Sequence, residues 1–341
     1  MGFDIRDLRR PVMVAPMAGG PSTPELAAAG SNAGGLGFLA AGYLTADALA
    51  DRITAARTLS SEPIGVNLFA PQPSVATPEQ IRAYATALAG EAQRYGVGLG
   101  DPRYDDDGWA VKLEVVLELR PEVVSFTFGL PGESEIAQLR RSGITTVGTV
   151  TTLDEARRAD GCGVDALVVQ GPAAGGHRGT FDPAAQPGTQ PLDRLLAEIL
   201  ATVQVPVAAA GGLIDADDVA GVLASGAVAA QLGTAFLLAD EAGSSPVHRA
   251  ALQDPAFTET VSTRAFSGRY ARGLRNRFID EHDGQAPLGY PEIHHLTSPL
   301  RKASAAAGDP QGTNVWAGTG WRRARTGSAA EIIDRATPTR G

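Results

Sequence analysis

A glycine-rich segment that contains a histidine carries residue types suited to chemistry on a bound ligand. The string GPAAGGHRGTF covers residues 171–181 and directly follows an apolar run that ends at Gln170. Glycines let the backbone approach a ligand closely, and an imidazole changes its protonation near neutral pH, which suits it to proton transfer. We therefore expect His177 to be a functional residue rather than a structural one.

Two further glycine-containing strings are placed to hold a phosphate group. AAGGLID covers residues 209–215 and QLGTAF covers residues 231–236, and each follows an apolar run. In a barrel of alternating strands and helices, backbone N–H groups after the seventh and eighth strands commonly bind phosphate. The residues that we expect at this site are Gly211, Gly212, Gln231, Leu232, Gly233 and Thr234.

Three neutral amides stand in or at the ends of apolar runs. These are Asn67, Gln170 and Gln231. A buried amide must be hydrogen-bonded, either to a ligand or to a neighbouring backbone group. Three amides that converge on one site suit the edge of a heteroaromatic ring, which carries both donors and acceptors.

The elements that would position these residues follow a regular alternation. Eight short runs rich in Val, Ile, Leu and Phe cover residues 12–16, 36–41, 64–69, 123–129, 145–150, 166–171, 205–212 and 228–237. Stretches with helical periodicity and Ser, Thr or Asp capping signals lie between them. This order predicts a (β/α)8 barrel, because an open doubly wound sheet explains eight regular repeats less well.

Two segments exceed what a barrel needs. The connection over about residues 70–122 is too long for one crossover helix, so we expect an inserted subdomain or lid with a helix near residues 109–119. The division that we expect is a barrel over residues 1–240 and a C-terminal extension over residues 241–341. The extension would form a smaller substrate-side or lid region.

Composition excludes several classes of protein. The formal net charge is -9, which disfavours nucleic acid as a partner, and no apolar run approaches the 18 residues of a membrane helix. The lone Cys162 cannot form a disulfide within the chain, and the histidines lack partners at metal-ligand spacing, so we expect no metal. The first residues are unlike a secretory signal, so we expect a cytoplasmic protein, and oligomerisation stays open. His294 and His295 are adjacent in what reads as an extended segment, so only one of them could face the site.

Several motifs in order resemble the nitronate monooxygenases, formerly called 2-nitropropane dioxygenases. The strings are APMAGGPSTPELAAAGSNAGGLGFLAAGYLT, GVNLF, VVQGPAAGGHRGTF, PVAAAGGLIDADDVAGVLASGAVAAQLGTAFL and RAFSGRYARG, and the resemblance spans about residues 11–321. It implies a barrel that binds FMN, with contacts from Met17, Asn67, Gln170, Gly175, Gly212 and residues 231–234. It also implies that His177 is the catalytic base.

The resemblance implies a reaction as well as a cofactor. His177 would remove the α-proton of a nitroalkane, and flavin and O2 would convert the nitronate to a carbonyl compound and nitrite. The chain departs from the family pattern at two positions, because Thr127 stands where many members have histidine and Ala173 stands where glutamate is usual. Both departures bear on the preferred substrate rather than on the flavin.

Two other functions compete with this interpretation. Related barrels with a similar phosphate site and loop histidine are FMN-dependent NAD(P)H reductases of quinones or enoyl thioesters. A flavin-binding protein without catalysis is the alternative from a different class. The histidine loop disfavours the second alternative, and the sequence does not name the natural substrate.

Overall fold

The computed structural model describes residues 2–339, and its centre is a closed barrel of eight parallel strands. In barrel order the strands are β1 (Val12–Val14), β2 (Leu36–Ala40), β3 (Ile64–Phe69), β4 (Val123–Thr127), β5 (Thr145–Val150), β6 (Ala166–Gln170), β8 (Val207–Ala210) and β9 (Ala229–Leu232). The barrel closes where β9 pairs with β1, with Val12 opposite Ala230. Each of the eight predicted runs contains one of these strands, and the predicted (β/α)8 fold is confirmed.

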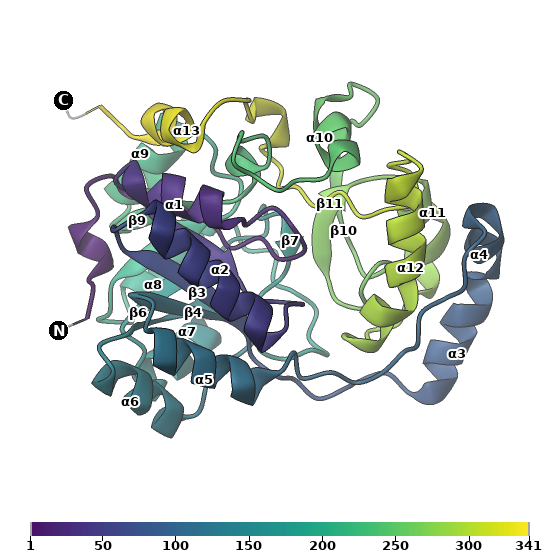
Figure 1. Ribbon diagram of the computed structural model, residues 1–341, viewed down its shortest axis with the longest axis horizontal. Coiled ribbons are helices and arrows are strands. Elements are labelled where there is room, and N and C mark those ends of the chain that lie inside the picture. The colour runs from purple at the N-terminus through teal and green to yellow at the C-terminus, as the bar shows by residue number, and fades with distance from the viewer. Residues whose placement is uncertain (1, 340–341) are drawn as a thin grey trace.

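A layer of helices surrounds the barrel (Figure 1). They are α1 (Pro24–Asn32), α2 (Ala46–Leu59), α5 (Trp109–Leu119), α6 (Glu133–Arg141), α7 (Leu153–Cys162), α8 (Leu192–Leu200), α9 (Ala216–Ala224) and α13 (Ala329–Ala336). Several begin as the capping signals predict: the side chains of Thr23, Thr45 and Thr152 each accept a hydrogen bond from a first-turn N–H. Residues 2–339 contain no helix that is both long and apolar enough to cross a membrane.

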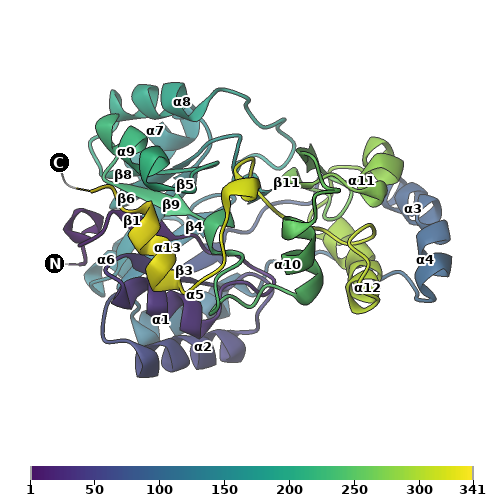
Figure 2. The same cartoon turned by 90° about the horizontal axis from the view of Figure 1, so that it is seen from above.

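A second lobe stands beside the barrel, as the two views show (Figures 1 and 2). Its helices are α3 (Pro78–Ala87), α4 (Ala89–Tyr95), α10 (Pro246–Gln253), α11 (Arg277–His282) and α12 (Glu292–Ala306). Its antiparallel sheet has the order β10 (Thr260–Thr263), β11 (Ala271–Leu274), β7 (Gly176–His177). The third of these strands comes from the barrel, so this sheet joins the two lobes.

The segment between β3 and β4 divides between the two lobes. Helices α3 and α4 pack against α12, through an apolar cluster that includes Tyr84, Leu88, Phe266, Phe278 and Leu296. Helix α5 instead packs against α2 and β3, in the helix layer of the barrel. The final helix, α13, likewise lies on the barrel, between α1 and α9.

One local expectation from the sequence is wrong. His294 and His295 lie in α12, which runs through Pro299, and not in an extended segment. The prolines at positions 291 and 299 hide this helix from a reading of the sequence, since an internal proline usually ends one. Successive residues of a helix are rotated by about 100°, and of the two histidines only His294 lines the cavity described below.

Gly37 lies where α1 crosses β2, and a Cβ there would overlap the backbone carbonyl of Ala27. We predict that Gly37→Ala lowers the free energy of unfolding by about 3 kcal/mol or more, because backbone atoms must move to relieve the overlap. Urea denaturation followed by circular dichroism measures this change. The matched control is Gly90→Ala in the exposed part of α4, where a Cβ meets nothing within 4 Å. We expect the control to be neutral or slightly stabilising, and equal effects at both positions would contradict the packing that we describe.

Candidate active site

A cavity of about 530 Å³ lies at the carboxyl ends of the barrel strands, beneath the second lobe. This volume is within the range of small-molecule and cofactor sites. Of the residues that the sequence predicts at the site, Met17, Asn67, Gln170, Gly175, His177, Gly211, Gly212, Gln231, Gly233 and Thr234 line it. Leu232 does not line it, because its side chain packs outward into the core between barrel and helices. The structure thus brings these residues together, while their roles stay predictions.

Hydrogen bonds on both sides of His177 fix its loop. Strand β7 pairs with β11, so that His177 lies opposite Ala271. The side-chain amide of Gln170 donates through Nε2 to the carbonyl oxygen of His177 at 3.0 Å and accepts the N–H of Gly179 at 2.9 Å. Gln170 therefore positions the histidine in addition to lining the cavity.

Ser267 from the second lobe orients the imidazole. Its Oγ lies 2.8 Å from Nε2 of His177 and 3.2 Å from the carbonyl oxygen of Arg269. A hydroxyl that donates to that carbonyl accepts the Nε2–H of the histidine. This arrangement leaves Nδ1 of His177 as the unprotonated nitrogen that can receive a proton.

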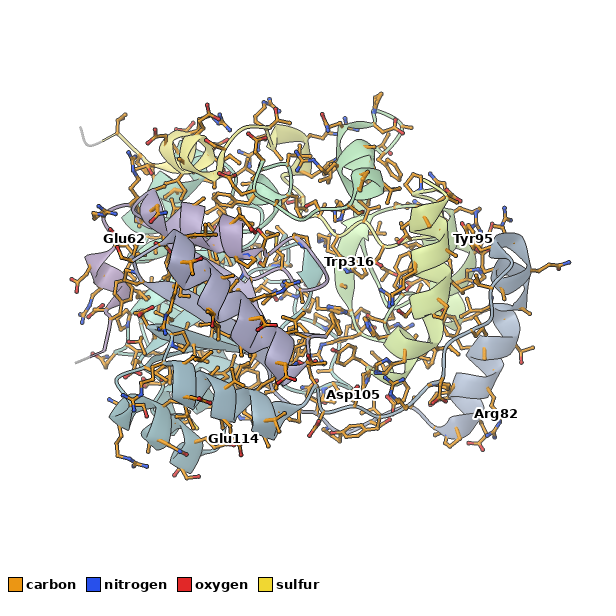
Figure 3. The ribbon with its side chains drawn as sticks, viewed as in Figure 1. Glu62, Arg82, Tyr95, Asp105, Glu114 and Trp316 are labelled. Carbon is orange, nitrogen blue, oxygen red and sulfur yellow. The ribbon has the colours of Figure 1, made fainter. Side chains whose placement is uncertain are left out.

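The surroundings of His177 keep it neutral. The rings of Phe128, Tyr290 and Trp316 have centroids within 5.8 Å of its own. Burial lowers the pKa of His177 to about 3, and the positive charges of Arg269 and Arg301 add to the effect. Since desolvation penalises the charged form, the imidazole is neutral throughout the physiological range. One of the three surrounding rings, that of Trp316, lies between the barrel and the second lobe (Figure 3).

The remaining two amides, Asn67 and Gln231, differ in which of their side-chain atoms lack a hydrogen-bond partner among the described residues. Asn67 donates through Nδ2 to the Ser125 carbonyl, the Ser125 hydroxyl and the Thr127 hydroxyl, at 2.9 to 3.2 Å. Among residues 2–339, no donor reaches its Oδ1, which is therefore available at the cavity. The amide of Gln231 has no protein partner within the same range and is available through both ends.

A cradle that only glycine can form lies at the ends of β8 and β9. Gly211 and Gly212 have φ of +117° and +80°, and a Cβ on Gly211 would come within 3.1 Å of the Gly171 carbonyl and the Ala174 nitrogen. Gly233 follows β9 and precedes a short 3-10 helix, Thr234–Phe236, whose first N–H groups have no partner within the helix. Free backbone N–H groups of this kind are what a phosphate binds.

The second lobe supplies two cavity residues that the sequence analysis misses, Ser298 and Arg301, beside His294, which it named. His294, Ser298 and Arg301 line the cavity from α12, at helical spacings of four and seven residues. This spacing would have been a signal had the segment been recognised as a helix. Ser267 carries no signal of its own, because its contact with His177 depends on how the two lobes pack.

A cluster of potential metal ligands lies away from the cavity, in the second lobe. Glu91, Glu281 and His282 bring their ligand atoms within 4.8 Å of one another. The sequence gives no hint of this cluster, because Glu91 belongs to the insertion. Arg277 donates to both carboxylates at 2.6 to 2.8 Å and supplies the positive charge that they need. The arrangement is an ion-pair network that joins α4 to α11.

Comparison with known proteins agrees with this geometry. The family model described as nitronate monooxygenase matches residues 4–338. The chain belongs to the nitronate monooxygenase family. A probable nitronate monooxygenase of Staphylococcus aureus is 38% identical over 330 residues, which cover 95% of this chain and 92% of that protein.

Two solved structures have the same fold. A nitroalkane oxidase from Streptomyces ansochromogenes is 49% identical, with a TM-score of 0.93 over 97% of this chain and 95% of that one. FabK from Thermotoga maritima has a TM-score of 0.75 at 24% identity, over 97% of this chain and 93% of that one, and shares the fold. This chain is thus an oxidoreductase of the nitronate monooxygenase family.

Nitronate monooxygenases are flavin enzymes, and the cavity fits such a cofactor. The glycine cradle would accept its phosphate, and the free ends of Asn67 and Gln231 would meet its ring. The two residues that depart from the family pattern both lie beside residues of this cavity. Thr127 accepts a hydrogen bond from Asn67, and the Ala173 Cβ lies only 3.0 Å from the place of a Cβ on Gly212.

We predict that His177 stays neutral when the folded protein is taken from pH 8 to pH 5. The lowered pKa of His177 means that the folded state resists the proton that the unfolded chain accepts near pH 6.5, so His177 weakens stability as the pH falls below that value. Nuclear magnetic resonance of ¹⁵N-labelled histidine reports the ring directly, with His177→Asn to assign the signal. Titration of this signal with a midpoint near pH 6.5 would contradict the environment that we describe.

Proposed function

We propose that this protein oxidises alkyl nitronates and nitroalkanes with O2 to a carbonyl compound and nitrite, using FMN and with His177 as general base. The observation that carries the proposal is a histidine, oriented by Ser267 and Gln170, in a cavity that also holds a glycine cradle. The substrates named for the Streptomyces and Staphylococcus relatives support it.

His177 meets the requirements of a base for a carbon acid. The α-proton of a nitroalkane is acidic because the negative charge that remains spreads over the nitro oxygens. A base must be unprotonated and within reach of that proton, and the neutral His177 lines the cavity in which a substrate would sit. A substrate supplied as the nitronate needs no such step.

The single phosphate site of the cavity supports FMN as the flavin. The cradle of Gly211, Gly212 and Gly233 offers one phosphate site, and the sequence holds no second glycine-rich fingerprint for an adenosine half. A bound flavin would supply the redox chemistry between the substrate and O2. The protein would contribute the position of the substrate, the base, and the apolar rings of Phe128 and Trp316 beside that base.

Gly212→Leu should empty the flavin site and leave the barrel folded. A side chain at this position would enter the cradle, and the backbone φ of +80° adds strain of about 1–2 kcal/mol. Gly143→Leu is the matched control, since Gly143 has the same φ of +80° but open space around it and does not line the cavity. Chromatography of the heat-released cofactor, with circular dichroism, should show FMN in the control and none in Gly212→Leu. FAD in either protein, or full occupancy of Gly212→Leu, would contradict the assignment.

His177→Asn should separate proton removal from the rest of the reaction. Asparagine keeps a hydrogen bond but cannot act as a base, so turnover of neutral nitroalkane should fall by about 10²- to 10⁴-fold. Turnover of the preformed nitronate should survive to a much larger extent. Steady-state rates with nitroethane and with its nitronate measure both. An equal loss with the two substrates would show that His177 acts in binding, and no loss with either would remove it from the mechanism.

A further inference from the structure

Arg301 brings a positive charge to the cavity that no carboxylate of the described chain neutralises. It lies on α12 and lines the cavity on the side of the second lobe. Its partners are all neutral: the Thr297 hydroxyl at 3.1 Å, the Asn314 side-chain oxygen at 3.2 Å, and the carbonyl and Nδ1 of His294 at 2.9 and 3.2 Å. Within residues 2–339 no acidic group lies at ion-pair distance from it, whereas Arg277 has two.

Hydrogen bonds hold the Arg301 guanidinium in place, and one of its N–H groups remains without a partner in the described chain. Burial lowers the pKa of Arg301 to about 10, so the guanidinium is still protonated at neutral pH. Its neutral partners occupy four of the five N–H groups that a guanidinium carries, which leaves one on Nη1. A buried charge without a counter-ion is unfavourable, and an anionic ligand in the cavity would relieve it.

Arg269, a buried arginine near the site, serves a different purpose. Arg269 donates to the carbonyl oxygens of Arg178 and Thr180 and to the side chain of Gln72, and its guanidinium lies 4.0 Å from the centre of the Phe128 ring. It does not line the cavity. Arg269 holds the histidine loop, and Arg301 is the arginine that a ligand can reach.

We propose that Arg301 binds the nitro oxygens of the substrate and supplies the counter-charge for the nitronate anion. The inference rests on the proposed function. When His177 removes the α-proton, the C–H bond breaks, the proton moves to the imidazole, and the electron pair spreads onto the two oxygens. A neutral pair thereby becomes an imidazolium and a nitronate, and Arg301 stabilises the nitronate.

This assignment explains why a histidine of low basicity can serve as the base. The charge of Arg301 contributes to the lowered pKa of His177, which makes proton transfer to it less favourable. The same charge lowers the free energy of the anion that the transfer creates, so the two effects offset each other. Electrostatic stabilisation of developing charge in a site shielded from water is typically a large part of catalysis.

Binding of an unreactive anion tests the proposal without turnover. Isobutyrate has the heavy-atom skeleton of the nitronate of 2-nitropropane, and isobutyramide is its neutral counterpart. Isothermal titration calorimetry of the flavin-loaded protein should give tighter binding of isobutyrate than of isobutyramide. Arg301→Met should weaken isobutyrate by about ten- to a hundredfold, the range for hydrogen bonds to charged groups, and leave isobutyramide within about twofold. Arg301→Lys should retain most of the preference.

The control removes a charge from the same lobe without touching the cavity. Arg82 on α3 is exposed, pairs with Glu79 and lies at the far edge of the lobe (Figure 3), so Arg82→Met should bind both probes as the wild type does. Equal binding of the two probes by the wild type would overturn the proposal even if Arg301→Met failed to fold. Unchanged isobutyrate binding by Arg301→Met, or an equal loss of both probes in Arg301→Met and Arg301→Lys, would overturn it as well.

The outcomes also separate this inference from the proposed function. If the wild type binds isobutyrate through Arg301 but oxidises no nitronate, the proposed function fails and the anion site stands. If the wild type oxidises nitronates and Arg301→Met still binds isobutyrate normally, only the present inference fails.

Discussion

The two-residue pairing of β7 with β11 is the contact on which the active site depends. It ties the histidine loop of the barrel to the second lobe, and the N–H of Arg178 continues it by donating to the carbonyl of Tyr270 at 2.8 Å. Because His177 sits in this pairing, its backbone is fixed by the barrel through Gln170 while its ring is oriented by Ser267 of the other lobe. The cavity is therefore a product of two lobes meeting and not of the barrel alone.

The second lobe encloses His177 and thereby also determines the electrostatic environment of its ring. Aromatic rings from both lobes surround the imidazole, and two arginines stand close enough to disfavour its protonation. Such a site prefers a neutral base and an anionic ligand, which is the combination that removal of a proton from a neutral carbon acid requires. The neutral partners of Arg301 leave its charge available to that ligand, because a carboxylate in their place would cancel it.

The sequence predicts those parts of the molecule that depend on residues close together in the chain. Apolar runs, capping residues and glycines with positive φ depend on near neighbours, so the eight strands and the cradle at Gly211 and Gly212 could be predicted. The orientation of His177 could not, because Ser267 lies 90 residues away and meets it only when the lobes pack. Arg301 was missed for another reason: the prolines at 291 and 299 conceal the helix that aims it at the cavity.

The central claim is that a nitronate bound in this cavity would reduce the flavin. The most direct test is to mix the flavin-loaded protein without oxygen with a preformed alkyl nitronate, and separately with NADH or NADPH, and to follow the flavin absorbance. We predict rapid loss of the oxidised flavin spectrum with the nitronate and none with either pyridine nucleotide. Rapid loss with NADH or NADPH and none with the nitronate would contradict the claim and indicate a reductase.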